Sequence, residues 1–326
     1  MKLTLRTSAA VTPLAAPLPL PAPLVVLPSP GRPQTFGALL RAFQDEVFGD
    51  ASPSHQYQQR IFHSKVLREV GDLPLTDVTP DVLRQWKATM QTQYKPGTVH
   101  LYMKRLARVF AYALQSDWIT SDPCRKVRRP SPGRGRVRFL TTDERVRLLA
   151  ACAQSRNPHL YAMVVVALNT GGRKNEIRGL LWNNVDIEAG VVRFVKTKTD
   201  RDRAVPLVGE ALTMLRALAQ RRPAEQPLVL PSRNGQAPAA MEMAWRHARR
   251  RAGLADVHFH DLRHTFASYM AMSGASLREI AELLGHSTIH MTMLYTHLMP
   301  SHTHSVVEKM AAQWLTTENT EDPHAE

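Results

Sequence analysis

A basic segment without any acidic residue, residues 125–138, divides the sequence into two parts that each carry their own hydrophobic pattern. Two prolines and two glycines within it oppose both helix and strand, so this segment should run extended. The whole chain has 326 residues, which leaves each part long enough to bury a core of its own. The sequence therefore predicts two domains joined by a basic linker.

The charge of the whole chain favours an anionic polymer as its partner. Lys and Arg number 42 against 28 Asp and Glu, which gives a formal net charge of +14. Half of that excess lies in the linker, whose cations could either follow a phosphate backbone or remain solvated. We favour contact with DNA. The expected contacts are Arg125, Lys126, Arg128, Arg129, Arg134, Arg136 and Arg138.

The first 34 residues imitate a secretion signal, because two basic residues precede a long uncharged stretch rich in Ala, Leu and Val. Eight of the 23 prolines lie between residues 13 and 33, and each of them would break a membrane-spanning helix. We therefore expect a disordered proline-rich leader over 1–34, and an acidic tail over 317–326. With only two cysteines, the chain has no disulfide framework, and we expect it in the cytoplasm rather than in a membrane.

Residues 35–123 are predicted to form an all-helical domain, because apolar residues recur at helical spacing in four segments. The second helix should cover residues 55–70, and the third has a clear start at Thr79 and Pro80. The fourth follows Pro96. The residues expected to face inward are Phe36, Leu39, Leu40, Phe43 and Val47 in the first helix, Val82, Leu83, Trp86 and Met90 in the third, and Val99, Leu106, Phe110 and Leu114 in the fourth.

Residues 139–316 are predicted to form a mixed domain, mostly helical with a small β-hairpin. It opens with a capping-box pattern at Thr141 and Glu144, ahead of the apolar Val146 and Leu149. A buried helix should cover 160–168, strands 191–195 and 204–207 should flank a turn, and residues 240–315 follow a helical pattern. The last helix has an apolar face that could pack on its own domain or dock on a second copy. That face consists of Val306, Val307, Met310, Ala311 and Trp314.

Four separated segments of this domain carry unusual polar residues, and each alone has an ordinary structural explanation. For example, His260 and His264 lie four residues apart and could hold zinc. However, Asp261 stands where a zinc-protease helix has its glutamate, so we expect no metal site there. The residues singled out are Arg173 and Glu176 after paired glycines, Lys198 in the hairpin turn, His260 and Arg263 at a helix start, and His286 and Tyr295 nine residues apart.

Together these segments resemble the tyrosine recombinase (phage integrase) family. They contain, in order, Thr-Gly-x-Arg-x-x-Glu, a hairpin lysine, His-x-Leu-Arg-His, Leu-Gly-His-Ser and Tyr-Thr-His. The resemblance covers 139–299 and, more weakly, the helical domain, which is similar to the family's core-binding domain. It implies a mainly α fold in which two domains form a C-shaped clamp on DNA. Gly172 departs from the family pattern, in which an apolar residue is commoner at that place.

The resemblance implies an enzyme that cuts and rejoins DNA at a specific core site through a 3′-phosphotyrosine. It implies no cofactor, metal or ATP, and a tetramer of protomers on two DNA sites in the nucleoid. Accessory proteins remain open, as does the choice between integration, excision and resolution. Two alternatives also remain open: relaxation of supercoils by a type IB topoisomerase, and a non-catalytic helix-turn-helix regulator that uses residues 276–285.

The resemblance also implies a role for each residue of the site. Tyr295 offers a phenol that can attack phosphorus, and Arg173 and Arg263 offer forked donors that match the phosphoryl oxygens. We expect His260 to handle the tyrosine proton. The remaining roles fall to His286 as a hydrogen-bond donor, Lys198 as general acid toward the 5′-oxygen, and Glu176 as a support for Arg173.

Overall fold

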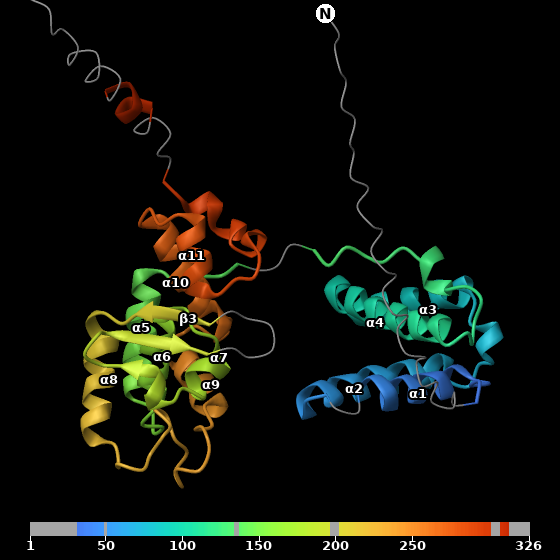
Figure 1. Cartoon of the computed structure of the whole chain (residues 1–326), viewed down its shortest axis with the longest axis horizontal. Coiled ribbons are helices and arrows are strands. Elements are labelled where there is room, and N and C mark those ends of the chain that lie inside the picture. Colours follow the sequence, from blue (N-terminus) through green and yellow to red (C-terminus); the bar gives the residue numbers. More distant parts are fainter. Residues whose placement is uncertain (1–30, 49–50, 134–136, 196–201, 301–306, 313–326) are drawn as a thin grey trace, which may run out of the picture. The chain divides into compact units, whose positions relative to one another are not determined.

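The computed structural model describes residues 31–48, 51–133, 137–195, 202–300 and 307–312. The chain divides into two compact units, residues 1–135 and 136–326 (Figure 1). Most of the expected leader and the whole acidic tail lie outside the described residues, as do Arg134, Arg136 and Lys198. Within the described ranges, no helix combines the length and the apolar character needed to cross a membrane.

Among its described residues, the first unit contains four α-helices: α1 (Phe36–Phe48), α2 (Pro53–Val70), α3 (Pro80–Gln93) and α4 (Pro96–Gln115). The last three begin with proline, whose missing N–H and fixed φ suit the first helical position. As the sequence predicts, Thr79 caps α3 by accepting a hydrogen bond from the backbone N–H of Val82.

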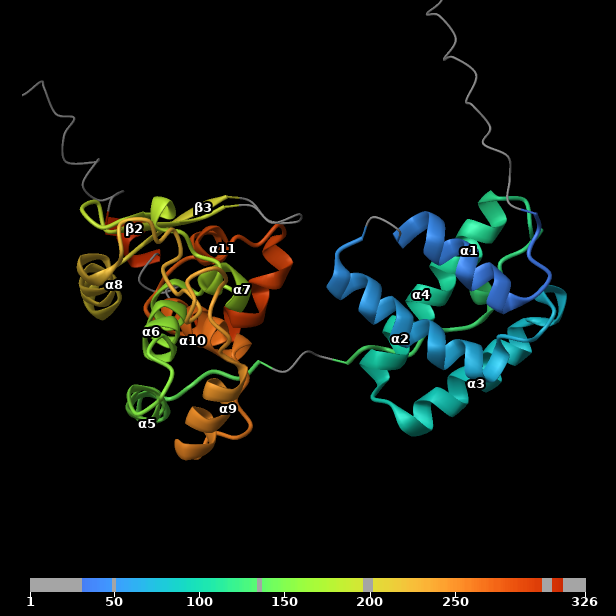
Figure 2. The same cartoon turned by 90° about the horizontal axis from the view of Figure 1, so that it is seen from below.

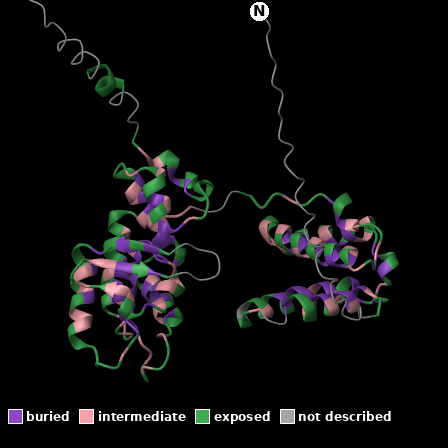
Figure 3. Ribbon diagram, viewed as in Figure 1, coloured by how far each residue is buried: buried purple, intermediate pink, exposed green. Residues whose placement is uncertain are grey.

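The core of the first unit lies between the facing sides of these helices (Figure 3). Phe36 of α1 stacks on Phe110 of α4, with ring centroids 5.2 Å apart. Val47 was expected in this core but is 40% exposed. The helix ends one residue later, and the buried ring of Phe48 packs edge-on against Phe43 instead. Leu114 is only half-buried near the end of α4.

Among its described residues, the second unit contains seven labelled α-helices and one further helical segment, residues 307–312. Figure 2 shows α6 in its interior, where it contacts α10, α5 and α8. A 3₁₀ helix, η5 (Met293–Leu298), packs on α10. The helices are α5 (Thr142–Ala153), α6 (Leu160–Thr170), α7 (Lys174–Arg178), α8 (Gly209–Arg221), α9 (Glu242–Arg251), α10 (His260–Met272) and α11 (Leu277–Leu284).

The capping box predicted at the start of α5 is present, with Thr141 and Glu144 bonded reciprocally. Of the two apolar residues that follow this box in the sequence, Val146 is 58% exposed and Leu149 packs partly buried against the core. The buried residues are Leu148, Ala151 and Cys152, which repeat at i, i+3 and i+4 and so share a face that excludes Val146.

A three-stranded antiparallel sheet completes the second unit, in the order β1 (Val185–Asp186), β2 (Val191–Phe194) and β3 (Arg203–Pro206). The predicted hairpin is confirmed, with Val192 opposite Val205, although each strand begins or ends one residue from its expected limit. The first strand of the sheet, β1, was not predicted from the sequence, because two residues are too few to show alternation. Side chains alternate along β3, so Arg203 and Val205 point inward.

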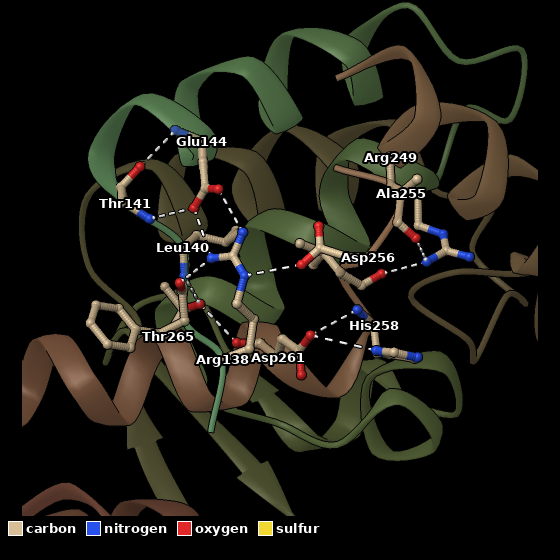
Figure 4. A network of polar contacts seen from close by, with 12 residues as sticks. Arg138, Leu140, Thr141, Glu144, Arg249, Ala255, Asp256, His258, Asp261 and Thr265 are labelled. Carbon is tan, nitrogen blue, oxygen red and sulfur yellow. Dashed lines mark hydrogen bonds and ion pairs between the residues drawn. The ribbon is translucent and has the colours of Figure 1, made fainter. Parts of the chain in front are cut away.

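Arg138, the last residue of the linker, is anchored inside the second unit (Figure 4). Its guanidinium donates to both carboxylate oxygens of Glu144, at 2.8 and 2.5 Å, and forms an ion pair with Asp256 at 3.3 Å. These bonds raise the pKa of Arg138 and lower that of Glu144 to about 2. Arg138 therefore holds the end of the linker to the second unit.

Residues 307–312 form a helical turn whose side chains are all exposed, with Val307 at 53% and Met310 at 40%. Within the described part of this segment, the apolar face is thus not covered by its own domain. Val306 and Trp314, the other large residues expected on that face, lie outside the described residues.

Candidate active site

The paired glycines do what the sequence predicts: they end one helix and place Arg173 at the start of the next. Gly171 follows α6 with φ +63°, a left-handed conformation that favours glycine. At Gly172, a Cβ would lie 2.8 Å from the ring of Phe194 and 2.9 Å from Ile177. The departure from the family pattern thus has a packing reason. Arg173 then forms the N-cap of α7.

Arg263 fixes the ends of three helices relative to one another. It lies in the first turn of α10, is 3% exposed, and donates to the carbonyl oxygens of Gly171 at 2.9 Å and Leu284 at 2.7 Å. Burial, together with the charges of Arg173 and Arg203, lowers the pKa of Arg263 to about 9. The lowered pKa shows that the positive charges around this guanidinium and its burial outweigh the negative charge of Glu176.

Glu176 is the carboxylate at the centre of these arginines. It accepts bonds from the backbone N–H of Arg173 at 2.7 Å, the Arg173 guanidinium at 3.0 Å and the Arg203 guanidinium at 2.5 Å. Burial would raise the pKa of Glu176, but these bonds outweigh it and lower the pKa to about 2. Arg263 is also close enough for the charge of Glu176 to raise its pKa, so one carboxylate lies among three guanidiniums. The excess positive charge suits an anion.

Arg203 is a residue of the site that the sequence reasoning missed. Its Nε donates to the carbonyl oxygen of Leu283 at 2.9 Å, and its guanidinium lies 4.6 Å from the centre of the Phe194 ring. Gly285, with φ +68°, leaves space for the Arg203 side chain, because a Cβ at this position would lie 3.0 Å from it. The available signal was alternation, because Arg203 shares its strand face with Val205.

His286 and His260 both have lowered pKa values, so both imidazoles are neutral at neutral pH. His286 contacts the buried hydroxyl of Thr292 through Nδ1 at 2.8 Å. Burial, together with the charges of the nearby arginines, lowers its pKa to about 4. His260 is exposed at the start of α10, and partial burial of its ring and the charges of Arg263 and Arg173 lower its pKa. Each ring can donate one N–H.

Tyr295 lies on η5 and is 2% exposed. Its hydroxyl lies 2.6 Å from Nδ1 of His264, not against His260 as the sequence reasoning expected. Burial raises the pKa of Tyr295 to about 12, although the charge of Arg263 acts in the opposite direction. The phenol is therefore protonated at neutral pH and needs a proton acceptor before it can act as a nucleophile.

The sequence matches the model of the phage integrase family over residues 138–302, and that of the phage integrase central domain over residues 36–130. The chain belongs to the phage integrase family of tyrosine recombinases. Helix α11, which the regulator hypothesis assigned to a helix-turn-helix, is part of this family's site here. The carbonyl oxygens of Leu283 and Leu284 at its end accept bonds from Arg203 and Arg263.

Individual relatives agree with this assignment. The shufflon-specific DNA recombinase of Escherichia coli is 29% identical over 74% of this chain and 64% of its own. The putative integrase of Pseudomonas phage Pf1 is 32% identical over 65% of this chain and 60% of its own. The chain thus spans under two thirds of the length of these two relatives. A lambda integrase tetramer bound to a Holliday junction shares the fold, with a TM-score of 0.66 at 20% identity, over 80% of this chain and 77% of that one.

Arg203→Ala should destabilise the second unit by about 3 kcal/mol, the lower end for breaking a buried ion pair, because Arg173 still contacts Glu176. The folded pKa of Glu176 lies below its ordinary 4.5, so its ion pairs stabilise the fold above that pH and less as the pH falls toward 2. The stability of the variant should therefore fall less than that of the wild-type protein over that acid range.

Thermal unfolding at several pH values measures both effects. The matched control replaces the exposed Arg193 of β2 with Ala. An unchanged melting temperature at neutral pH would contradict the role given to Arg203.

Proposed function

We propose that this protein is a site-specific DNA recombinase that cuts and rejoins strands through a 3′-phosphotyrosine at Tyr295. One observation carries the proposal: three arginines surround a single carboxylate, close enough to Tyr295 for its hydroxyl and Arg263 to shift each other's pKa. Such an excess of forked donors fits a DNA phosphate, whose negative charge would balance it.

Each residue then has a task in the displacement at phosphorus. Arg173 and Arg263 hold the two non-bridging oxygens, and His260 and His286 donate hydrogen bonds to the developing charge. Lys198, outside the described residues, is proposed as the general acid that protonates the leaving 5′-oxygen. The covalent bond to tyrosine conserves the energy of the phosphodiester. Rejoining therefore requires neither ATP nor a metal in this proposal. Among the described residues, no group of three or more His, Cys, Asp and Glu is placed to hold a metal ion.

The partner in this proposal is a DNA duplex with a core site, bound by residues 35–123 as core-binding domain and by residues 139–316 as catalytic domain. Exchange between two sites requires four protomers, as in the lambda integrase tetramer. The exposed apolar side chains of Val307 and Met310 support docking on a second copy. Relatives named as recombinases and integrases favour this function over a topoisomerase.

The linker is proposed to follow the DNA backbone, and four of its expected contacts are described and exposed: Arg125, Lys126, Arg128 and Arg129. Replacing Arg128 and Arg129 with Gln should weaken binding to all DNA sequences. Each lost phosphate contact lowers the slope of log affinity against log salt by about 0.9. Fluorescence anisotropy over a salt series measures this slope. The control replaces Arg84 and Arg278, which carry the same charge but already pair with Asp81 and Glu282. Equal slopes in both variants would make the linker a solvated connection.

Capture of cleaved DNA tests the proposed function without knowledge of the core site. Wild-type protein is incubated with a randomised pool of nicked duplexes, in which loss of a short fragment traps the covalent intermediate. Complexes that survive denaturant are recovered and sequenced. We expect a recurrent sequence with one cleavage position. Retention of DNA only under native conditions would show a binding protein without strand-transfer activity.

A further inference from the structure

We propose that His264 is a further catalytic residue, which accepts the proton of the Tyr295 hydroxyl as that oxygen attacks phosphorus. The inference rests on the proposed function and deepens it. Its basis is the contact of 2.6 Å between His264 Nδ1 and the tyrosine oxygen, the atom that would react. A general base must lie within this distance of the proton that it takes.

The other two histidines of the site are placed less well for this task. Nδ1 of His286 is already engaged with the hydroxyl of Thr292, at 2.8 Å. His260 lies one helical turn before His264, and the two rings meet edge-on with centroids 5.0 Å apart. It is therefore the neighbour of the acceptor, whereas His264 itself touches the nucleophile.

Local structure holds both members of the pair in place. His264 lies in the second turn of α10, and η5 packs against that helix. The ring of Tyr295 is buried with Ala267 and Ala271 of α10 and with Leu284 at the end of α11. The contact thus joins two elements that pack on each other, which favours a fixed path for the proton.

The charges around His264 keep it ready to accept a proton. Its pKa is lowered by burial, and further by His260 and Arg263, while Asp261 raises it. His286 lies close enough to His264 for the charge of His264 to lower the pKa of His286. His264 is therefore neutral at neutral pH, and the tautomer with hydrogen on Nε2 leaves Nδ1 free to accept. A bound phosphate would bring negative charge, which favours the imidazolium that forms.

The proposed step balances. The O–H bond of Tyr295 breaks, and its proton moves to Nδ1 of His264. The electron pair left on the tyrosine oxygen forms the bond to phosphorus. The bond from phosphorus to the 5′-oxygen breaks, and that oxygen takes a proton from the general acid. In the rejoining step, the same proton returns from His264 to the tyrosine oxygen.

The test is single-turnover cleavage of the duplex recovered from the randomised pool, measured across pH. His264→Gln should slow cleavage by about 10²- to 10⁴-fold at neutral pH without weakening DNA binding. The wild-type rate should be flat above the pKa of His264 and fall below it. The variant's rate should instead rise about tenfold per pH unit toward the pKa of the phenol, since phenolate must then form unaided. His290→Gln, an exposed histidine of the same domain, is the matched control.

A second measurement separates proton transfer from structural support. Replacing Tyr295 by 3,5-difluorotyrosine gives a more acidic phenol, which should restore most of the rate lost in His264→Gln and change wild type little. His264→Asn serves as a second variant if the glutamine protein unfolds. If His264→Gln cleaves more slowly but keeps the wild-type pH profile, and 3,5-difluorotyrosine does not restore the rate, His264 is only a packing residue. Faster cleavage by His264→Gln would instead mean that the contact restrains the tyrosine. Either result overturns the proposal, whereas absence of any wild-type adduct would overturn the recombinase function itself.

Discussion

Tyr295→Phe should bind DNA with unchanged affinity and form no covalent protein–DNA adduct. The substitution removes only the hydroxyl, so the ring still packs against Ala267 and Leu284. The cost to folding is the single hydrogen bond to His264, about 1 kcal/mol. The cost to strand cleavage is complete, because phenylalanine has no atom that can attack phosphorus.

Denaturing gel electrophoresis of the captured duplex measures the adduct, and anisotropy measures binding. Tyr269→Phe is the matched control, because the hydroxyl of this half-buried tyrosine of α10 lies 3.3 Å from the hydroxyl of Thr142, whereas that of Tyr295 contacts His264. The control should form adducts like wild type. An adduct formed by Tyr295→Phe would show that another residue is the nucleophile.

Arg263→Ala should lower the rate of cleavage by more than about 10³-fold, since removal of one donor to a developing oxyanion already costs about 10²- to 10³-fold. It should also destabilise the fold, because the buried carbonyl oxygens of Gly171 and Leu284 lose their donor, at about 1–3 kcal/mol for each group left unsatisfied. Thermal unfolding and single-turnover cleavage measure the two effects separately.

Arg263→Lys separates charge from geometry. Lysine keeps the positive charge, but its single ammonium cannot reproduce the planar fork that reaches both carbonyls. We expect partial recovery of stability and little recovery of cleavage. Arg278→Ala, whose side chain is 85% exposed on α11, should leave both properties unchanged. Cleavage by Arg263→Ala within about tenfold of wild type would contradict its role at the phosphate.

Local signals in the sequence predicted much of the fold. Pro80 and Pro96 mark helix starts because their fixed φ suits the first turn, and the Thr141 capping box marks the start of α5. Gly171 ends α6 because it adopts the left-handed conformation. Each of these signals acts within a few residues of the chain, so it can be read without knowledge of the tertiary structure.

The missed features depend on pairs that are distant in the chain. Arg203 becomes part of the site only because β3 places it beside Glu176, 27 residues earlier, and beside the end of α11. His264 stood in a motif, but only the position of η5, 31 residues later, gives it Tyr295 as a partner. Arg138 lies in the basic linker, and its ion pairs include one with Asp256, 118 residues later in the chain.

The most direct test of the central claim is to identify the bond that joins protein and DNA. Wild-type protein trapped on the captured duplex is digested with protease and nuclease, and the remaining nucleotide–peptide is sequenced by tandem mass spectrometry. The account predicts a single modified peptide, with the phosphate of a DNA 3′ end on the oxygen of Tyr295. Attachment to any other residue, or through a DNA 5′ end, would contradict it.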